Sequence, residues 1–430
     1  MRKEVVSKIR SHALAATCAV ALLATSHPAL AQSASSDDTL AGSSDTSSVG
    51  RIGRIDDSLR RFTLRRLLYK VATDPYGEYS EFKARFEKDT GISWSMDLNY
   101  LQQWGRRDGG SPAGQWLAMP LIDWKLFDSS TAGSGSLQLA YSAARYSTRQ
   151  SAAAVQGKLG LITPVNDYAE RQNTFAQLTY THALPGNKVS VTVGQYPFYN
   201  FDGNQYLANQ QQNFNSYILA QNGSATYALA GLGAYVQVNA TSTIQFAAGL
   251  QSANNISGAT LSTRHFGDDG YSRFGYAQWT PAFKGLGAAQ YSITYYEVPG
   301  VPLQSPKSHG WSLNAVQNLN DTWAVFARAN KAYDYVTTIR ASYALGVALN
   351  DPLGRSTSDQ IGLAFGYSDA EPQPTNPAGT RDEKLVEAYW NWTFAKGLLF
   401  TPGVQYIRNP ALDPSRDSAW VVSLRSTLMF

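Results

Sequence analysis

Arg425 is a charged residue within an alternating polar and apolar segment at the C-terminal end of the chain. Ser423 and Thr427 share its parity, whereas Trp420 and Leu424 take the opposite one. A period of two with one apolar face is typical of a strand that has lipid on one side and water on the other. On the watery side, an arginine offers hydrogen bonds and an electric field to dissolved molecules.

Further polar side chains fall on the same predicted face of their own segments. They alternate with apolar neighbours in the ranges 323–332, 340–349 and 385–394. The predicted water-facing set is Arg425, Glu387, Tyr389, Arg340 and Arg328. The pattern is weakest at Arg328, because Phe326 shares its parity. A second interpretation stays open for each charged member, in which an arginine and a glutamate only neutralise each other and stiffen the wall.

A second candidate is the polar stretch that follows the range 188–196. Asp202, Asn204 and Tyr206 place a carboxylate, an amide and a phenol close together in the sequence. Such groups hydrogen-bond to hydroxylated molecules, and an aromatic face packs against apolar C–H surface. Two arrangements are open: the stretch folds inward as a constriction, or it forms an outward surface loop.

The sequence does not favour catalysis or a metal site. The histidines beyond residue 31 are His182, His265 and His309, and none has a Ser or Asp at a recognisable triad spacing. The chain contains neither a His-x-x-x-His nor a Gly-x-Ser-x-Gly motif. The acidic turn at 267–270 has too few oxygen ligands to predict a calcium site. We therefore expect no enzyme activity, no cofactor and no metal.

Residues 1–31 have the organisation of a secretory signal peptide, with a basic start, an apolar stretch over 13–24 and Ala29-Leu30-Ala31 as the cleavage site. Cys18, the single cysteine, lies in the apolar stretch, so the exported chain is expected to fold without disulfides. The segment also holds four basic residues and one acidic residue out of 36 and 32, which leaves the remaining charges nearly balanced. Composition therefore gives no case for nucleic acid as a partner.

After the signal, no run approaches the roughly 20 apolar residues of a spanning helix, yet aromatic residues make up 12% of the chain. Alternating segments begin at Ile92 instead. Sixteen are predicted, over 92–100, 116–127, 136–147, 175–183, 188–196, 226–238, 243–253, 271–282, 288–298, 309–318, 323–332, 340–349, 358–368, 385–394, 398–407 and 419–430. Short and long connections alternate between them, which is typical of an all-β, antiparallel transmembrane β-barrel with its short turns in the periplasm.

We divide the chain into a signal peptide (1–31), a low-complexity and helical arm (32–75) and a barrel domain (76–430). Residues 32–50 are rich in Ser, Asp and Gly, which is typical of disorder. Apolar residues then recur at helical spacing, first over 55–71 and later at Tyr79, Phe82 and Phe86. This predicts one or two short amphipathic helices before the barrel. Docking in the periplasmic mouth, contact with a partner and a plain linker are all open roles.

Several blocks of this sequence resemble the carbohydrate-selective porins of the OprB family. They are Val193-Gly194-Gln195-Tyr196, Phe201 to Tyr206, Asn213 to Asn215, Leu345-Gly346, Pro352 to Arg355, Asp359 to Gly362, Glu387 to Trp390 and Thr401 to Pro410, followed by Asp417, Arg425 and Phe430. The sequence departs from the pattern at Gly403, where the family often has an acidic residue. The spacing between Arg355 and Asp359 is also one residue longer than expected.

This resemblance implies an outer-membrane porin through which carbohydrates and other small solutes diffuse passively. Its partners would be sugars as solutes, outer-membrane lipid and the barrel assembly machinery, with the terminal Phe430 as insertion signal. A conduit for polysaccharide export shares the same fold and is the alternative function, and a barrel enzyme is a further one. Which sugar passes, and whether the barrel is a monomer or a homo-oligomer, stays open.

Overall fold

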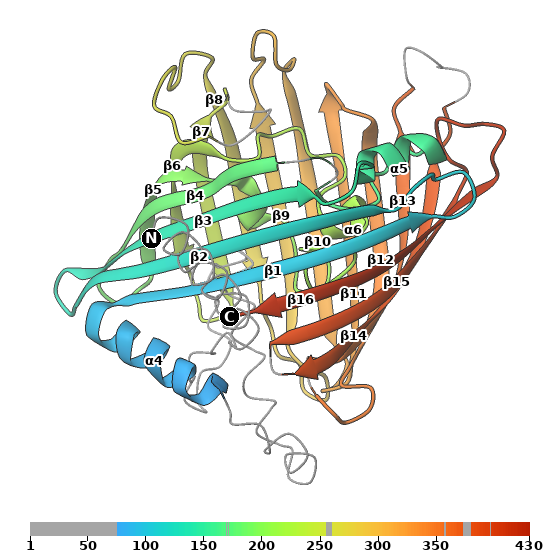
Figure 1. Cartoon of the computed structure of the whole chain (residues 1–430). Coiled ribbons are helices and arrows are strands. Elements are labelled where there is room, and N and C mark those ends of the chain that lie inside the picture. Colours follow the sequence, from blue (N-terminus) through green and yellow to red (C-terminus); the bar gives the residue numbers. More distant parts are fainter. Residues whose placement is uncertain are drawn as a thin grey trace, which may run out of the picture.

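The computed structural model describes residues 75–430, apart from 169, 171, 255–259, 357, 373–379 and 396. Over these residues the chain forms one closed antiparallel barrel, in which each strand pairs with its neighbours in sequence and β1 pairs with β16 (Figure 1). The strands are β1 (Ile92–Gly105), β2 (Ala113–Ser129), β3 (Gly133–Tyr146), β4 (Gln172–Ala183), β5 (Val189–Tyr196), β6 (Gly231–Asn239), β7 (Ile244–Ser252), β8 (Tyr271–Trp279), β9 (Ala289–Val298), β10 (Ser308–Asn318), β11 (Trp323–Asp334), β12 (Ile339–Asn350), β13 (Gln360–Ala370), β14 (Glu383–Ala395), β15 (Leu398–Arg408) and β16 (Ser418–Met429).

The predicted barrel and its strand number are confirmed, although strand ends differ from the predicted ones by a few residues. The helical elements of the described chain are α4 (Pro75–Thr90), α5 (Ala152–Leu159), the 3-10 turn η3 (Phe198–Phe201) and α6 (Tyr217–Ala220). Among the described residues, no helix is long and apolar enough to cross a membrane. The signal peptide and most of the arm, predicted over residues 1–74, lie outside the described residues.

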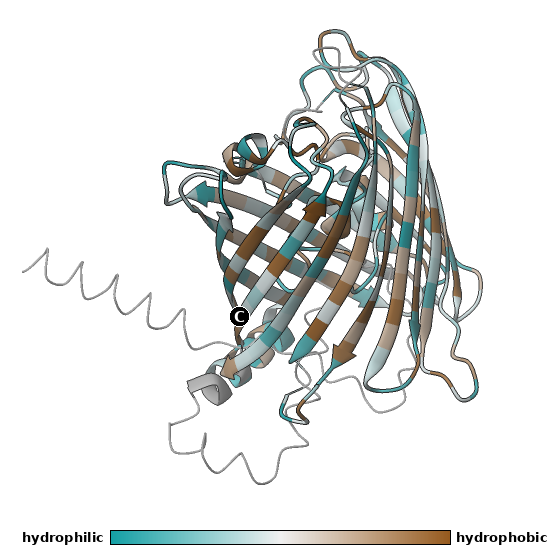
Figure 2. Cartoon of the chain, turned by 90° about the vertical axis from the view of Figure 1, so that its right-hand side faces the viewer, coloured by the Kyte–Doolittle hydropathy of each residue, from teal (hydrophilic) through white to brown (hydrophobic). Residues whose placement is uncertain are grey.

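Polar and apolar residues alternate along the strands, as the hydropathy bands show (Figure 2), and side-chain burial alternates in the same way along β16. In β16, Trp420 and Leu424 are 47% and 45% exposed on the outer face, whereas Arg425 is 0% exposed on the inner one. The predicted parity of this strand is therefore confirmed. Apolar side chains on the outer face need no water in lipid. Pairing between the strands satisfies the hydrogen-bonding groups of the backbone.

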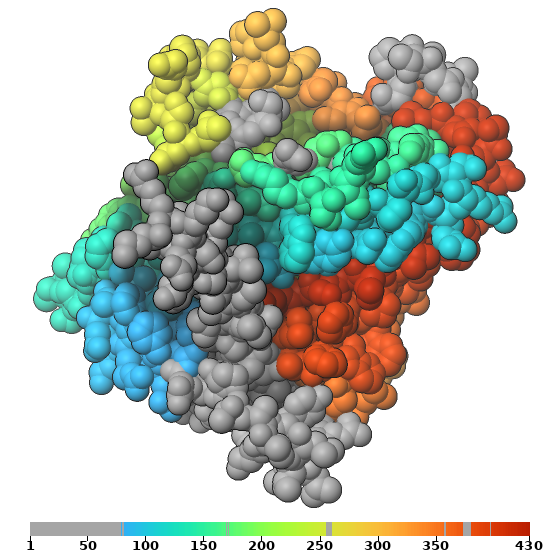
Figure 3. All heavy atoms as spheres, in the orientation of Figure 1, coloured from blue at the N-terminus to red at the C-terminus, as the bar shows by residue number. Residues whose placement is uncertain are grey.

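The wall closes where the last strand meets the first. The amide of Met96 donates to the carbonyl of Phe430, and the amide of Phe430 donates back to the carbonyl of Met96. Deeper in this seam, Asn99 Nδ2 donates to Thr427 Oγ1 at 2.8 Å. In the space-filling view, the early strands in cyan lie directly against the last strands in red (Figure 3). The terminal residue is thus part of the closing ladder.

Helix α4 packs against the start of β1. Its residue Phe86 lies edge-on to Trp94, with ring centroids 5.2 Å apart, and Trp94 Nε1 donates to the Tyr79 hydroxyl at 2.9 Å. Lys83 Nζ donates to the carbonyl of Trp94 at 2.5 Å. Trp94 belongs to the outward-facing residues of β1, so α4 lies beside the outer wall at the short-turn end.

The two longest connections run over residues 147–171 and 197–230, on the opposite side from the short turns. Both return into the barrel, where their apolar side chains pack against inward-facing residues of the wall. One cluster joins α5 and α6 to β11, β12 and β14; the other joins η3 to aromatic rings of β8 and β9. The interior of this barrel is therefore partly filled by its own loops.

Candidate functional site: two loops inside the barrel

Arg425 holds one of these loops against the wall. Its guanidinium Nη1 donates to the backbone carbonyls of Gln210 and Asn213, the latter at 2.6 Å, and to Asn215 Oδ1 at 3.1 Å. Nη2 donates to Asn391 Oδ1 at 3.1 Å. A planar guanidinium presents several donors in fixed directions, so one side chain can satisfy several buried carbonyls. The predicted inward arginine is thus an anchor for backbone oxygens.

Glu387 and Tyr389 hold the same segment from β14. The Glu387 carboxylate accepts from the amides of Asn215, at 2.7 Å, and Ser216, at 2.9 Å. Tyr389 packs edge-on against Phe214, with centroids 4.8 Å apart. The segment thus presents carbonyl acceptors to the positive charge of Arg425 and amide donors to the negative charge of Glu387.

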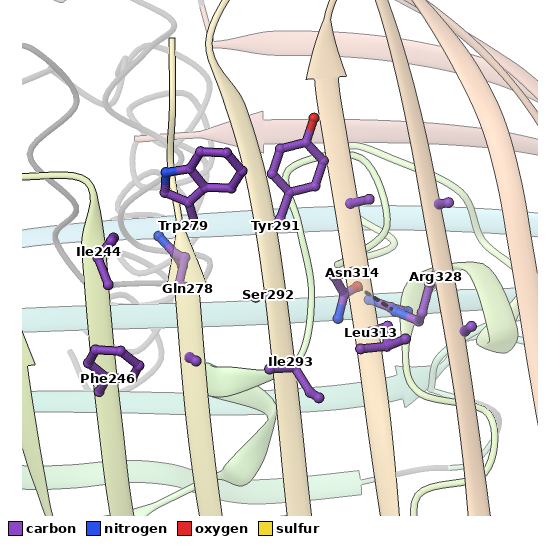
Figure 4. Close-up of a pocket in the computed structure, with 14 residues that line it drawn as sticks. Ile244, Phe246, Gln278, Trp279, Tyr291, Ser292, Ile293, Leu313, Asn314 and Arg328 are labelled. Atoms are coloured by element: carbon purple, nitrogen blue, oxygen red, sulfur yellow. Dashed lines mark hydrogen bonds between the residues drawn. The ribbon is translucent and has the colours of Figure 1, made fainter. Parts of the chain in front are cut away.

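Arg328 and Asn314 fix an earlier part of the loop. Arg328 Nε donates to Asn314 Oδ1 at 3.0 Å, and Nη2 donates to the carbonyl of Leu207. Figure 4 shows this Arg328–Asn314 pair bridging β11 and β10. Arg328 is therefore inward-facing even though the apolar Phe326, which packs under the loop, shares its parity.

Asp202 is the buried acceptor of the loop. Its Oδ1 accepts from Ser312 Oγ at 2.6 Å and Asn314 Nδ2 at 3.1 Å, and its Oδ2 accepts from Asn222 Nδ2 at 2.8 Å and the Tyr227 hydroxyl at 3.1 Å. Four hydrogen bonds replace the water that the carboxylate loses on burial. Asp202 thereby ties the two ends of the loop to each other and to β10.

Asn204 and Tyr206 also lie inside the barrel. Asn204 Oδ1 accepts from the amides of Tyr206 and Leu207, both at 2.9 Å, which forms a tight turn. The ring of Tyr206 stacks on Phe326, with centroids 5.1 Å apart, and its hydroxyl accepts from Asn350 Nδ2 at 3.1 Å. Of the two arrangements open for this stretch, the structure has the inward one.

Arg340 is the one predicted side chain that the structure does not bring to this group. A β-bulge between Ile339 and Ala341 adds an unpaired residue, so the parity of β12 does not extend to Arg340. Its side chain is 41% exposed and pairs with Asp369 at 2.6 Å and Glu371 at 3.6 Å near the long-loop rim. Simple alternation cannot reveal a bulge, which is why the sequence grouped Arg340 with the others.

The second loop is held by groups from both sides of the seam. Gln103 Nε2 of β1 and Gln405 Nε2 of β15 both donate to the carbonyl of Val165, each at 2.9 Å. The Glu383 carboxylate accepts from the amides of Ile162, at 2.8 Å, and Thr163, at 3.0 Å. Residues 160–168 are therefore fixed inside the barrel beside residues 197–230.

Comparison with known proteins agrees with this architecture. The sequence model of the family described as "Carbohydrate-selective porin, OprB family" matches residues 138–430. The chain belongs to this family. Porin AaxA of Chlamydia felis is 36% identical over 349 residues, covering 79% of this chain and 78% of the relative. Porin AaxA of Chlamydia abortus is 34% identical over 379 residues, covering 85% of this chain and 84% of the relative.

The porin also resembles a solved structure in fold. The high-pH structure of Pseudomonas putida OprB superposes with a TM-score of 0.67 over 82% of this chain and 97% of that chain, at 14% sequence identity. The predicted family, barrel fold and outer-membrane location are confirmed. The family is one of porins, and the fold is that of a porin barrel.

Sequence analysis missed four polar residues of the porin's inner loops that are partly exposed to solvent. Asp167, Tyr199, Tyr217 and Gln221 are partly exposed, unlike the strand charges that anchor the loops. Burial by the surrounding protein raises the pKa of the Asp167 carboxyl to about 6. No pattern marks these residues, because loop side chains have no period of two. The one available signal was that the two connections before β4 and after β5 contain Asp and Tyr residues.

At the short-turn end of the porin, side-chain contacts fix the connection between β12 and β13. Arg355 Nη2 donates to both carboxylate oxygens of Asp359, at 2.8 and 2.6 Å, and its guanidinium lies 3.9 Å from the ring centroid of Trp392. Asp359 Oδ1 also accepts from the amide of Thr393 at 2.7 Å. These are residues of the Arg355 to Asp359 block on which the family resemblance was noted. Their contacts fix the turn to β14.

The outer wall of the porin carries an apolar groove of about 570 Å³. Figure 4 shows Phe246, Trp279, Tyr291, Ile293 and Leu313 around it, on strands β7 to β10. Of these side chains, Phe246, Trp279, Ile293 and Leu313 are exposed on the lipid-facing side of the wall. Within the described part of the chain, no three metal-ligating side chains come together.

Proposed function

We propose that this porin mediates passive diffusion of small carbohydrates across the outer membrane. The observation that carries the proposal is the inward course of residues 160–168 and 197–230, which narrows the barrel with a surface of amides, hydroxyls and phenols. The family description supports a carbohydrate as the solute.

The chemistry of this interior suits neutral, hydroxylated solutes. Sugars lose water when they enter a narrow passage, and amide or hydroxyl groups on the wall replace those hydrogen bonds. Each contact must be weak and exchangeable, since tight binding would stop conduction. The strand charges support the passage indirectly, because Arg425, Glu387 and Arg328 hold the loops that form its surface.

The filled interior favours small solutes over a polymer. An export conduit for polysaccharide needs a continuous wide lumen, whereas here segment 210–216 is bound to both β14 and β16. Moving it aside would break several buried, charge-assisted hydrogen bonds at once. Diffusion then follows the concentration gradient, and net movement is inward when the sugar is outside.

Swelling of proteoliposomes containing the purified porin tests this proposal. We expect a monosaccharide and a disaccharide to enter faster than uncharged, non-sugar solutes of similar mass, and a long oligosaccharide to enter slowly. Liposomes with heat-unfolded porin provide the baseline. Equal rates for sugars and mass-matched non-sugars would contradict carbohydrate preference, and baseline rates for every solute would contradict diffusion itself.

A further inference from the structure

Asp167, Tyr199, Tyr217 and Gln221 form one cluster between the two inward loops. Gln221 Nε2 donates to Asp167 Oδ2 at 3.1 Å. The phenol side chains of Tyr199 and Tyr217 lie close enough to interact with each other and with the charge of Asp167. The cluster thus combines one carboxylate, one amide and two aromatic rings from segments far apart in the sequence.

These four residues belong to the partly exposed surface of the inward loops. Each is partly exposed, whereas their neighbours Asn166, Ile218 and Asn222 are at most 1% exposed. Asn166 is bonded to Gln103 of β1, and Ile218 packs against β13. A solute inside the barrel would therefore meet the partly exposed cluster rather than these buried neighbours.

The cluster is also held in a fixed geometry. The amide of Asp167 donates to Gln210 Oε1 at 2.8 Å, and the amide of Tyr217 donates to the carbonyl of Pro164 at 3.1 Å. The ring of Tyr199 packs edge-on against Tyr227, with centroids 5.0 Å apart. These hydrogen bonds join the two loops. The side chains of the cluster therefore need little ordering when a solute binds, which lowers the entropic cost of binding.

The functional groups match those that recognise a pyranose. A carboxylate accepts hydrogen bonds from two adjacent hydroxyls, an amide both donates and accepts, and the phenol rings offer faces to the C–H surface. The charged residues near the cluster are Arg328 and Asp202, and Asp202 is already bonded to four donors. The surface that remains open to the solute is therefore mainly hydroxyl, amide and ring.

We propose that Asp167, Tyr199, Tyr217 and Gln221 form a weak saccharide-binding site on the inner loops, at which a sugar pauses during its passage. This inference deepens the proposed function and rests on it. It assigns solute contact to loop residues and leaves the strand charges as positioning residues.

Single-channel current in a planar bilayer tests the site, with a disaccharide titrated as the blocking solute. The Asp167→Asn variant keeps the shape of the side chain and removes its charge, and Tyr217→Leu removes a ring and a hydroxyl. Each is expected to weaken sugar block about fivefold, the size of one or two lost hydrogen bonds. Asp321→Asn in an exposed short turn and Tyr343→Leu on the lipid face are matched controls that should leave the block unchanged.

The outcomes separate the two proposals. Sugar block that is normal in both variants would overturn the binding site and leave carbohydrate diffusion standing. A wild-type channel that conducts ions but shows neither sugar block nor sugar-driven swelling would overturn the proposed function and the site together. Stronger block by guanidinium than by sugar, lost in Asp167→Asn, would overturn the assignment to a saccharide. If Tyr217→Leu lacks the heat-dependent gel shift of a folded barrel, Tyr217→Phe and Asp167→Asn carry the test.

Discussion

Arg425 and Glu387 are each hydrogen-bonded to the backbone of the same loop instead of forming a simple ion pair with each other. The loop gives carbonyls to Arg425 and amides to Glu387, so both charges are satisfied by the segment that they hold. This arrangement links charge inside the wall to the width of the passage. A substitution at either residue should therefore act on conductance through the position of the loop.

The Arg425→Ala variant tests this link. We expect it to cost about 1–3 kcal/mol, because the carbonyls of Gln210 and Asn213 lose their donor, while the barrel itself stays closed. Conductance and current noise should rise as the loop loosens, and ion selectivity should change. The control is Leu424→Arg, in the middle of the outer face of the same strand, which places a charge in lipid at about 2–4 kcal/mol. Equal loss of folded barrel in both, with unchanged selectivity in Arg425→Ala, would contradict the assignment.

We expect Asp167 to give the porin a pH dependence. Its pKa is raised to about 6 by burial, so the folded loop favours the protonated form, and that stabilisation is lost as the pH rises through about 6. We expect the cation preference in reversal-potential measurements to increase between about pH 5 and about pH 7, as the carboxyl ionises. The ionisable groups that face it are Arg328, Asp202, Tyr168, Tyr199 and Tyr217.

Two variants separate the contributions to this transition. Asp167→Asn should abolish the change in selectivity over this range. Asp202→Asn keeps Asp167 and should leave the transition in place. A transition that persists in Asp167→Asn would show that Asp167 is not its source.

At the level of single residues, the sequence was informative wherever a side chain sits in a regular strand. Alternation placed Arg425 correctly relative to Leu424, because a strand repeats every two residues. It failed at Arg340, because the bulge at Ile339 and Ala341 breaks the repeat. It had no means to find Gln221 beside Asp167, since that contact depends on how two separate loops fold into one lumen.

At the level of elements, the seam between β1 and β16 depends on the last residue of the chain. Phe430 exchanges two backbone hydrogen bonds with Met96, so the ladder runs to the terminus. Closing a barrel removes both sheet edges, and an open edge in lipid would leave backbone groups without partners. The last strand is thus required for closure of the barrel.

Deleting Phe430 tests the seam. We expect the variant to be exported across the inner membrane but not to assemble, so the heat-dependent gel shift of a closed barrel should disappear. Phe430→Leu keeps the backbone bonds and an apolar side chain and should largely restore the shift. A normal shift in the deletion variant would show that closure does not require the terminal residue.

Helix α4 is an element whose existence was predicted from apolar spacing and whose position was not. Its aromatic residues meet Trp94, which the alternation of β1 places on the outer wall. We expect Trp94→Ala to release the helix, because Phe86 and Tyr79 lose their partner. Limited trypsin digestion should then cut faster at the exposed Arg85. Trp420→Ala, an outward tryptophan on β16, is the control, and equal cutting in wild type and Trp94→Ala would contradict docking.

At the scale of the whole molecule, the barrel and its contents differ in how far sequence predicts them. The wall follows from local rules, since alternation gives the strands and connection length gives their ends, so sixteen strands in consecutive pairing could be predicted. The interior follows from contacts between residues more than 100 positions apart, such as Asn215 with Glu387, and these leave no periodic pattern in the sequence. A hydrophilic loop outside the barrel and one folded into it have similar composition.

The inward loop can therefore be tested separately from the wall. The ends of the segment lie close together, because the ring of Tyr227 is 5.6 Å from Phe198 and 5.0 Å from Tyr199, measured between centroids. Excision of residues 203–225 with a short Gly-Ser linker should thus join Asp202 to Thr226 at a small closure cost. The wall strands keep all of their pairings in this variant.

We expect the excised porin to show the heat-dependent gel shift of a folded barrel, a conductance several times higher than wild type and little discrimination among sugars by size. The reason is that Arg425, Glu387 and Arg328 lose the segment that they hold and face water instead. The matched control is an excision within the exposed loop between β7 and β8, which leaves both inward loops in place. Unchanged conductance in a correctly folded 203–225 excision would mean that another part of the barrel limits the conductance. It would also show that the position of this loop does not determine the selectivity of the porin.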